Sequence, residues 1–116
     1  MTLSGRTVLI LEDEAIVAFA LEDMLLDIGA SVVLTSTIEQ GFACADDPEI
    51  ALAVLDVNVN GMKSYAFAEA LQQRAVPIVF ATGYGEAEHP PRFANAPTLT
   101  KPYTRQQLVQ VVEALV

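Results

Sequence analysis

Five short apolar runs alternate with segments of helical periodicity along this chain, and this order constrains the fold more than any other feature. The runs are rich in Val, Leu and Ile and lie at residues 7–11, 31–35, 50–55, 78–81 and 98–100. The first run is continuous, which is typical of a strand buried on both faces. Strands that alternate with helices form a parallel sheet covered on both faces. We therefore predict an α/β fold, a doubly wound five-stranded parallel sheet of order 2-1-3-4-5.

The helical segments are of unequal quality. Residues 17–28 carry apolar side chains at helical spacing before Gly29, and residues 64–74 form another helical pattern. Capping boxes are predicted at Ser36 with Glu39 and at Thr104 with Gln107. Residues 57–61 are expected to form a loop. Residues 86–96 contain two prolines and weak periodicity, which predicts a short or poorly formed fourth helix and a mobile output surface.

Composition limits the class of protein. The 116 residues, 53% hydrophobic and 18% charged, suit a single folded domain over 1–116 and exclude a disordered chain. One cysteine excludes a disulfide framework and a multi-cysteine metal site. No apolar run approaches the roughly 20 residues of a membrane span, and no signal-peptide pattern is visible. We expect a cytoplasmic protein that does not contact the membrane.

The charge is strongly acidic and unevenly distributed. The net charge is -9, and eleven of the fifteen acids lie from Glu12 to Asp56. So few basic residues make direct nucleic-acid binding a poor hypothesis. The acids either form a solvated face or gather into a pocket that holds a cation.

Five polar residues follow the ends of predicted strands and favour the pocket. They are Glu12 and Asp13 after the first strand, Asp56 after the third, Thr82 after the fourth and Lys101 after the fifth. Carboxyl ends of parallel strands share one sheet edge, where ligands bind at the point of reversed winding. Clustered carboxylates repel one another unless a cation such as Mg²⁺ compensates. With a hydroxyl and a lysine, they suit phosphoryl transfer with Asp56 as nucleophile.

At these residues the chain resembles the receiver domain of two-component response regulators, which has a flavodoxin-like fold. The motifs are Leu11-Glu12-Asp13-Glu14, Val54-Leu55-Asp56-Val57-Asn58, Thr82 and Lys101-Pro102. The resemblance implies phosphorylation of Asp56 by a histidine kinase or phosphotransfer protein, in a signalling domain that is not an enzyme in its own right. It further implies Mg²⁺ held by Asp13 and Asp56, by Glu12 through water, and by the backbone carbonyl of Asn58.

The same resemblance assigns roles to the remaining motif residues. Thr82 and Lys101 are expected to contact the phosphoryl group, and the Lys101–Pro102 bond to be cis. A downstream protein is expected to bind the face of the fourth and fifth strands. The tract Phe80-Ala81-Thr82-Gly83-Tyr84 is similar to one branch of receivers, common in alphaproteobacteria and sometimes active in general stress signalling.

Two positions depart from the common receiver pattern. Asn60-Gly61 stands where many receivers carry a Pro and a Gly farther along the loop, and Thr98 replaces the usual switch aromatic. Tyr84 or Tyr103 could take over that switch role. His89, before a proline, is expected on the loop surface.

Two other functions fit these residues less well. A haloacid-dehalogenase-type phosphatase also uses an aspartyl nucleophile with Mg²⁺, but places it after the first strand and needs a cap domain. A flavodoxin-like FMN carrier would need a Ser/Thr/Gly-rich loop after the first strand, where this chain is acidic.

Overall fold

The computed structural model describes residues 3–83 and 89–115, which form a parallel sheet between two layers of helices. The sheet strands are β1 (Thr7–Leu11), β2 (Ser31–Thr35), β3 (Ile50–Asp56), β6 (Ile78–Thr82) and β7 (Thr98–Thr100). Their spatial order is β2-β1-β3-β6-β7, and every neighbouring pair is parallel. In sequence order this is 2-1-3-4-5, so the predicted topology is confirmed.

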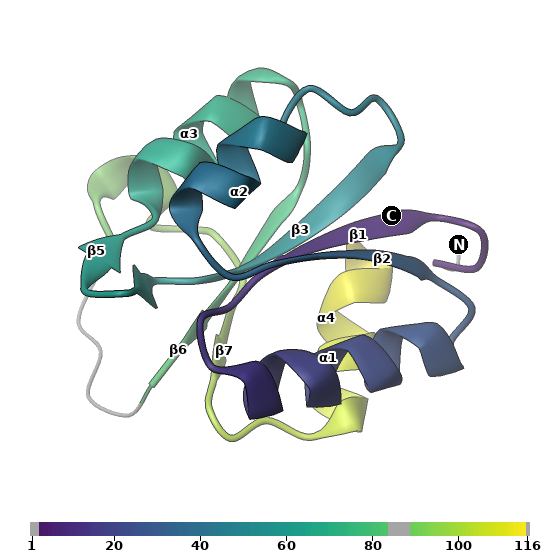
Figure 1. Cartoon of the computed structure of the whole chain (residues 1–116). Helices are drawn as coiled ribbons and strands as arrows, with labels where there is room; N and C mark the ends of the chain where they lie inside the picture. Colours follow the sequence, from purple (N-terminus) through teal and green to yellow (C-terminus); the bar gives the residue numbers. More distant parts are fainter. Residues whose placement is uncertain (1–2, 84–88, 116) are drawn as a thin grey trace.

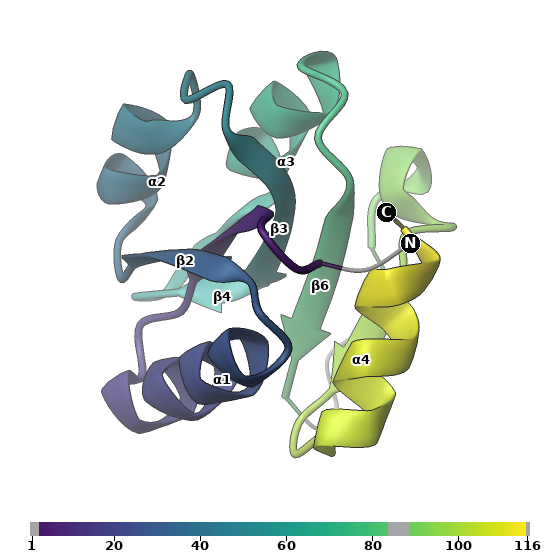
Figure 2. The ribbon, with the colours of Figure 1, turned by 90° about the vertical axis from the view of Figure 1, so that its right-hand side faces the viewer.

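The four α-helices cover the sheet in pairs. They are α1 (Ala15–Asp27), α2 (Ile38–Cys44), α3 (Tyr65–Gln73) and α4 (Arg105–Ala114). Figure 1 shows α2 and α3 on one face and α1 and α4 on the other, and Figure 2 shows the same layers from the side. None of the helices in the described ranges has the length and apolar character of a membrane span.

Alternating side chains of the central strands build two separate cores. In β1, Leu9 and Leu11 pack toward α2 and α3, whereas Val8 and Ile10 pack toward α1 and α4. All four are fully buried. Burial on both faces explains why the sequence of β1 is a continuous apolar run.

The cap of α2 differs from the prediction by one residue. Thr37, not Ser36, is the N-cap, and its hydroxyl accepts the Gln40 N–H at 3.0 Å. The side chain of Gln40 turns back to accept the Ser36 N–H at 2.8 Å. The other predicted capping box, Thr104 with Gln107, is confirmed at the start of α4.

The segment expected to be an irregular loop after β3 contains a small hairpin. β4 (Asn58–Val59) pairs antiparallel with β5 (Met62–Lys63). Asn60 and Gly61 form its turn, with φ of 52° and 80°. Asn-Gly is a strong signal for a two-residue hairpin turn, so the sequence held the information that the loop prediction missed.

The predicted fourth helix is short, as expected. In the described part of this segment, the regular element is a single 3-10 turn, η1 (Pro91–Phe93). Proline fixes its own φ and restricts the residue before it, which explains why the helix is short. Residues 84–88, with Tyr84 and the start of the segment expected to be mobile, lie outside the described residues.

Candidate functional site

The strand ends bring the predicted polar residues to one edge of the sheet. Asp56 and Thr82 are the last residues of β3 and β6. Glu12 and Asp13 follow β1, and Lys101 follows β7. Because β1 and β3 are adjacent and their connections run to opposite sides, Asp56 lies at the point where the winding reverses.

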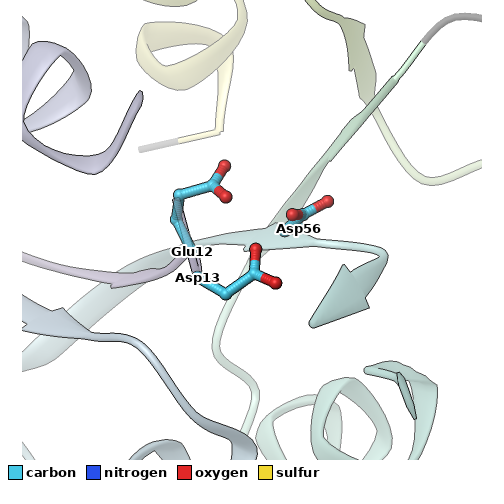
Figure 3. A group of neighbouring side chains, drawn as sticks. All are labelled: Glu12, Asp13 and Asp56. Atoms are coloured by element: carbon cyan, nitrogen blue, oxygen red, sulfur yellow. The ribbon is translucent and has the colours of Figure 1, made fainter. Parts of the chain in front are cut away.

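Glu12, Asp13 and Asp56 point toward one another (Figure 3). One carboxylate oxygen from each lies within 4.8 Å of the others. Glu12 and Asp56 are buried, with 4% and 7% of their surface exposed, and Asp13 is half-buried. Of the two readings of the acidic charge, the structure therefore favours a pocket for these three residues.

Lys101 joins two of these carboxylates. Its Nζ donates to Glu12 Oε1 at 2.6 Å and lies 3.2 Å from Asp56 Oδ2. Its backbone N–H donates to the Thr82 carbonyl at 2.7 Å, which ties β7 to the end of β6. The Lys101–Pro102 peptide bond is cis, as predicted.

The pKa of the Asp56 carboxyl is set mainly by its burial. Burial, together with repulsion from Glu12, raises the pKa of the Asp56 carboxyl from 3.8 to about 7, although Lys101 acts in the opposite direction. Burial would lower the pKa of Lys101, but the carboxylates of Glu12 and Asp56 outweigh it and the net shift is upward. The three carboxylates outnumber the single ammonium of Lys101, and a pocket with this excess of acids can bind a further cation.

Asp13 has a different environment from the other two acids. Burial would raise its pKa, but hydrogen bonds outweigh that effect and hold the pKa below its usual value. The largest of these is from the backbone N–H of Asn60, which donates to Asp13 Oδ2 at 2.8 Å. The Asp13 carboxyl is therefore ionised at neutral pH.

The donor set fits Mg²⁺. The cluster offers carboxylate oxygens and no sulfur or imidazole, and hard oxygen ligands are those that Mg²⁺ prefers. Asn58, whose carbonyl was predicted as a further ligand, is the first residue of β4, two residues after Asp56. Its role as a ligand, like that of the Thr82 hydroxyl toward a phosphoryl group, stays a prediction.

His89 lies in a loop, as predicted, but it is half-buried and not at the surface. Its Nδ1 lies 2.7 Å from the Tyr65 hydroxyl and its Nε2 lies 2.7 Å from Thr98 Oγ1. The ring centroid is 4.6 Å from that of Phe80 in β6. The half-buried imidazole therefore bridges α3 and β7 at Thr98, the position where the sequence lacks an aromatic residue.

No local pattern could have placed His89. Its two hydrogen-bond partners are 24 and 9 residues away in the chain. Tyr65 and Phe67 also pack against neighbouring side chains: Phe67 is fully buried, and Tyr65 stacks on Phe93 with ring centroids 5.9 Å apart.

Several solved structures are similar to this chain over nearly its whole length. SdrG from Sphingomonas melonis Fr1 is 38% identical, with a TM-score of 0.85, over 99% of this chain and 98% of that chain. The BeF3-activated conformation of SdrG from Pseudomonas melonis Fr1 is 40% identical, with a TM-score of 0.79, over 94% of each chain. A response regulator receiver protein from Sinorhizobium medicae WSM419 is 25% identical, with a TM-score of 0.80, over 95% and 93%.

Sequence comparisons define the family. A search of curated proteins found no match. The family model of the response regulator receiver domain matches residues 8–113, a range that includes all of the site residues described above. The chain therefore belongs to the response regulator receiver domain family, the phosphoacceptor signalling modules of two-component systems.

Proposed function

We propose that Asp56 is the phosphoacceptor of this receiver domain and that residues 1–116 form one such domain. The observation that carries this proposal is the position of Asp56 at the reversal of the sheet, facing Glu12 and Asp13 and paired with Lys101. Glu12 lies closer to Lys101, at 2.6 Å, but its carboxylate also accepts the Glu14 N–H, and the Asp13 carboxylate accepts the Asn60 N–H.

The reaction follows from the residues at hand. An Asp56 carboxylate oxygen attacks the phosphorus of a phosphohistidine, a P–O bond forms, and the P–N bond to the donor imidazole breaks. The electron pair of the P–N bond stays on the imidazole nitrogen, which takes up a proton. Asp56 must be ionised to attack, and its pKa of about 7 makes this ionisation sensitive to cations in the pocket.

Lys101 and Thr82 are proposed to stabilise the phosphoryl group. The Lys101 ammonium already lies 3.2 Å from Asp56, so a short movement brings it to a phosphoryl oxygen. Thr82, at the end of the neighbouring strand, offers a hydroxyl donor. The Lys101 N–H donates to the Thr82 carbonyl, which joins the ends of β6 and β7. A movement of either side chain is therefore transmitted to both strands.

We propose that Asp13 and Asp56 bind Mg²⁺ directly, with Glu12 acting through water and the Asn58 carbonyl as a further ligand. When bound, Mg²⁺ neutralises the carboxylates and the oxygens of the incoming phosphoryl group. The Glu12 carboxylate is engaged by Lys101 and by the Glu14 N–H at 3.0 Å. We therefore expect Asp13→Asn to weaken Mg²⁺ binding more than Glu12→Gln.

The partners proposed are a histidine kinase or phosphotransfer protein as donor, and a downstream protein at the β6–β7 face, in the cytoplasm. The tract Phe80-Ala81-Thr82-Gly83-Tyr84 and the likeness to SdrG support membership of the Phe-Ala-Thr-Gly-Tyr branch of receivers. A phosphatase of the haloacid dehalogenase type is not favoured, because Asp56 lies at the end of β3 and not at the end of the first strand.

The experiment is labelling with a small phosphodonor, acetyl phosphate, in the presence and absence of Mg²⁺. The wild-type chain should gain one alkali-labile phosphoryl group only with Mg²⁺, and Asp56→Asn should gain none. Asp46→Asn, which changes an exposed acid at the opposite end of the sheet, is the matched control and should be labelled like the wild type. Full labelling of Asp56→Asn would refute the assignment.

A further inference from the structure

The turn of the β4–β5 hairpin has a backbone geometry that few residues adopt. Asn60 and Gly61 both have positive φ, and the residues on either side, Val59 and Met62, are paired across the hairpin. Positive φ at both central residues is the feature of a type I′ turn. Asn and Gly are the residues that enter this region at low cost.

This turn aims a backbone donor into the acidic pocket. The Asn60 N–H donates to Asp13 Oδ2 at 2.8 Å, across 47 residues of sequence. The Asn60 side chain holds the turn from the other side, since its Nδ2 donates to the Ser36 carbonyl at 3.3 Å. Asn60 thereby links the loops that follow β1, β2 and β3.

The three carboxylates differ in the kind of partner that they contact. Glu12 and Asp56 are paired with the ammonium of Lys101. Asp13 is held instead by a neutral amide, which restricts the carboxylate without supplying a positive charge that would compete with a cation. A carboxylate can accept about four hydrogen bonds through its two oxygens, so this donor leaves capacity for a metal.

We infer that Asn60 is a positioning residue for the cation site: its N–H fixes the Asp13 carboxylate toward Glu12 and Asp56 before any ion binds. The inference rests on the proposed role of Asp13 as a direct Mg²⁺ ligand. A carboxylate that is already oriented loses less conformational freedom on binding, so the fixed rotamer increases affinity. Hydrogen-bond partners of metal ligands have this effect in other metal sites.

Variants at position 60 separate the N–H from the side chain. Asn60→Pro has no N–H and cannot adopt the observed φ of 52°. An ester in place of the peptide N–H of residue 60 removes the donor alone and keeps the Asn side chain. Asn60→Gly keeps the N–H and the turn geometry and loses the contact with Ser36.

The deciding measurement is the Mg²⁺ dissociation constant of each full chain, from a titration followed by NMR amide shifts. The ester and Asn60→Pro should both bind Mg²⁺ about tenfold more weakly than the wild type. Asn60→Gly should recover most of the affinity lost in Asn60→Pro. Wild-type affinity in the ester would overturn the inference, and so would equally weak binding by Asn60→Gly and Asn60→Pro.

A second readout needs no metal. In the Mg²⁺-free protein the Asn60 amide proton should resonate downfield, and Asp13→Ala should move it upfield. An Asn60 proton that Asp13→Ala leaves in place would contradict the contact itself. Phosphoryl labelling of the wild type is a separate result: a wild type that binds Mg²⁺ yet accepts no phosphoryl group would refute the proposed function and leave this comparison of affinities standing.

Discussion

The Lys101 ammonium lies closer to Glu12, at 2.6 Å, than to Asp56, at 3.2 Å. Both members of the shorter pair are shielded, with 16% of the Lys101 side chain and 4% of the Glu12 side chain exposed. In this state the lysine neutralises part of the pocket that we assign to Mg²⁺. Glu12 therefore holds the lysine in addition to the role toward Mg²⁺ that we propose for it, and on this proposal the lysine and the metal ion compete for the same acids.

This competition makes a prediction for Lys101→Met. Without the ammonium, the pocket keeps its acids and loses a neighbouring positive charge, so Mg²⁺ should bind about fivefold more tightly. The Mg²⁺-free variant should be less stable by about 1–3 kcal/mol, because two buried carboxylates lose their partner. Titration calorimetry measures the first effect and urea unfolding the second.

Arg105→Met is the matched control for Lys101→Met. It removes the same unit of charge from an exposed pair with Asp27 on α1. Its Mg²⁺ affinity and stability should stay near those of the wild type. Weaker Mg²⁺ binding by Lys101→Met would show that the lysine organises the site instead of competing for it.

The raised pKa of Asp56 predicts how stability depends on pH. Its folded-state pKa of about 7 lies above the unfolded value of 3.8, so the folded chain binds more protons between these pH values. Stability from this group is therefore present below the unfolded pKa and is lost as pH rises toward 7. Asp56→Asn removes the loss, and should stabilise the Mg²⁺-free chain by about 1–2 kcal/mol at pH 8.

The gain should vanish near pH 4, where Asp56 is largely protonated in the folded chain. Thermal unfolding of wild type and variant across this range measures it. Saturating Mg²⁺ should reduce or reverse the gain at pH 8, because the ion stabilises the wild-type carboxylate. A variant that is equally more stable at both pH values would contradict the electrostatic explanation.

The contacts of His89 predict its tautomer. Thr98 Oγ1 donates to the Ala96 carbonyl at 3.2 Å, so it must accept from His89 Nε2. In the Nε2–H tautomer, Nδ1 accepts the hydroxyl proton of Tyr65. NMR correlation of the ring nitrogens with the ring protons should show a proton on Nε2.

Substitution checks the same contacts. His89→Phe keeps an aromatic ring beside Phe80 and loses both hydrogen bonds, which should lower stability by about 1–3 kcal/mol. Tyr65→Phe should lower it by about 1 kcal/mol, because it removes the hydrogen bond between the Tyr65 hydroxyl and His89. A His89→Phe variant as stable as the wild type would show that the bridge does not hold β7 to α3. An Nδ1–H tautomer would contradict the hydrogen-bond directions assigned to His89.

The ends of α1 and α3 form a natural pair for testing backbone strain. Both helices end in the same motif, with a left-handed residue next: Gly29 at φ 91° and Ala75 at φ 61°. Ala75→Gly should stabilise the chain by about 0.5–1 kcal/mol, since glycine has no Cβ to clash. Gly29→Ala should destabilise it, because a Cβ there would lie 2.9 Å from Ser4 Oγ. Urea unfolding of both variants decides, and a loss of stability in Ala75→Gly would contradict the account.

Much of the fold and the arrangement of the site was predictable from the sequence. The five sheet strands are local apolar runs, and the parallel topology brings Glu12, Asp13, Asp56, Thr82 and Lys101 to one edge. The alternation of strands and helices in the sequence predicts the sheet topology, and the topology alone decides which strand ends lie next to one another. It does not give distances, so the preference of Lys101 for Glu12 was not foreseen.

The features that were missed depend on backbone detail or on distant partners. The Asn60–Gly61 turn was visible as a dipeptide, but its contact with Asp13 joins two loops 47 residues apart. The cap at Thr37 was misplaced by one residue because adjacent Ser and Thr are both good caps, and tertiary packing chooses between them.

The central claim is that Asp56 receives the phosphoryl group, and mapping the modified residue tests it most directly. The wild-type chain is phosphorylated with acetyl phosphate and Mg²⁺, and the acyl phosphate is reduced with borohydride, which converts a phosphorylated aspartate to homoserine. Peptide mass spectrometry then locates the homoserine. We predict that it appears at position 56, and homoserine at Asp13, or at neither residue in a fully phosphorylated chain, would contradict the account.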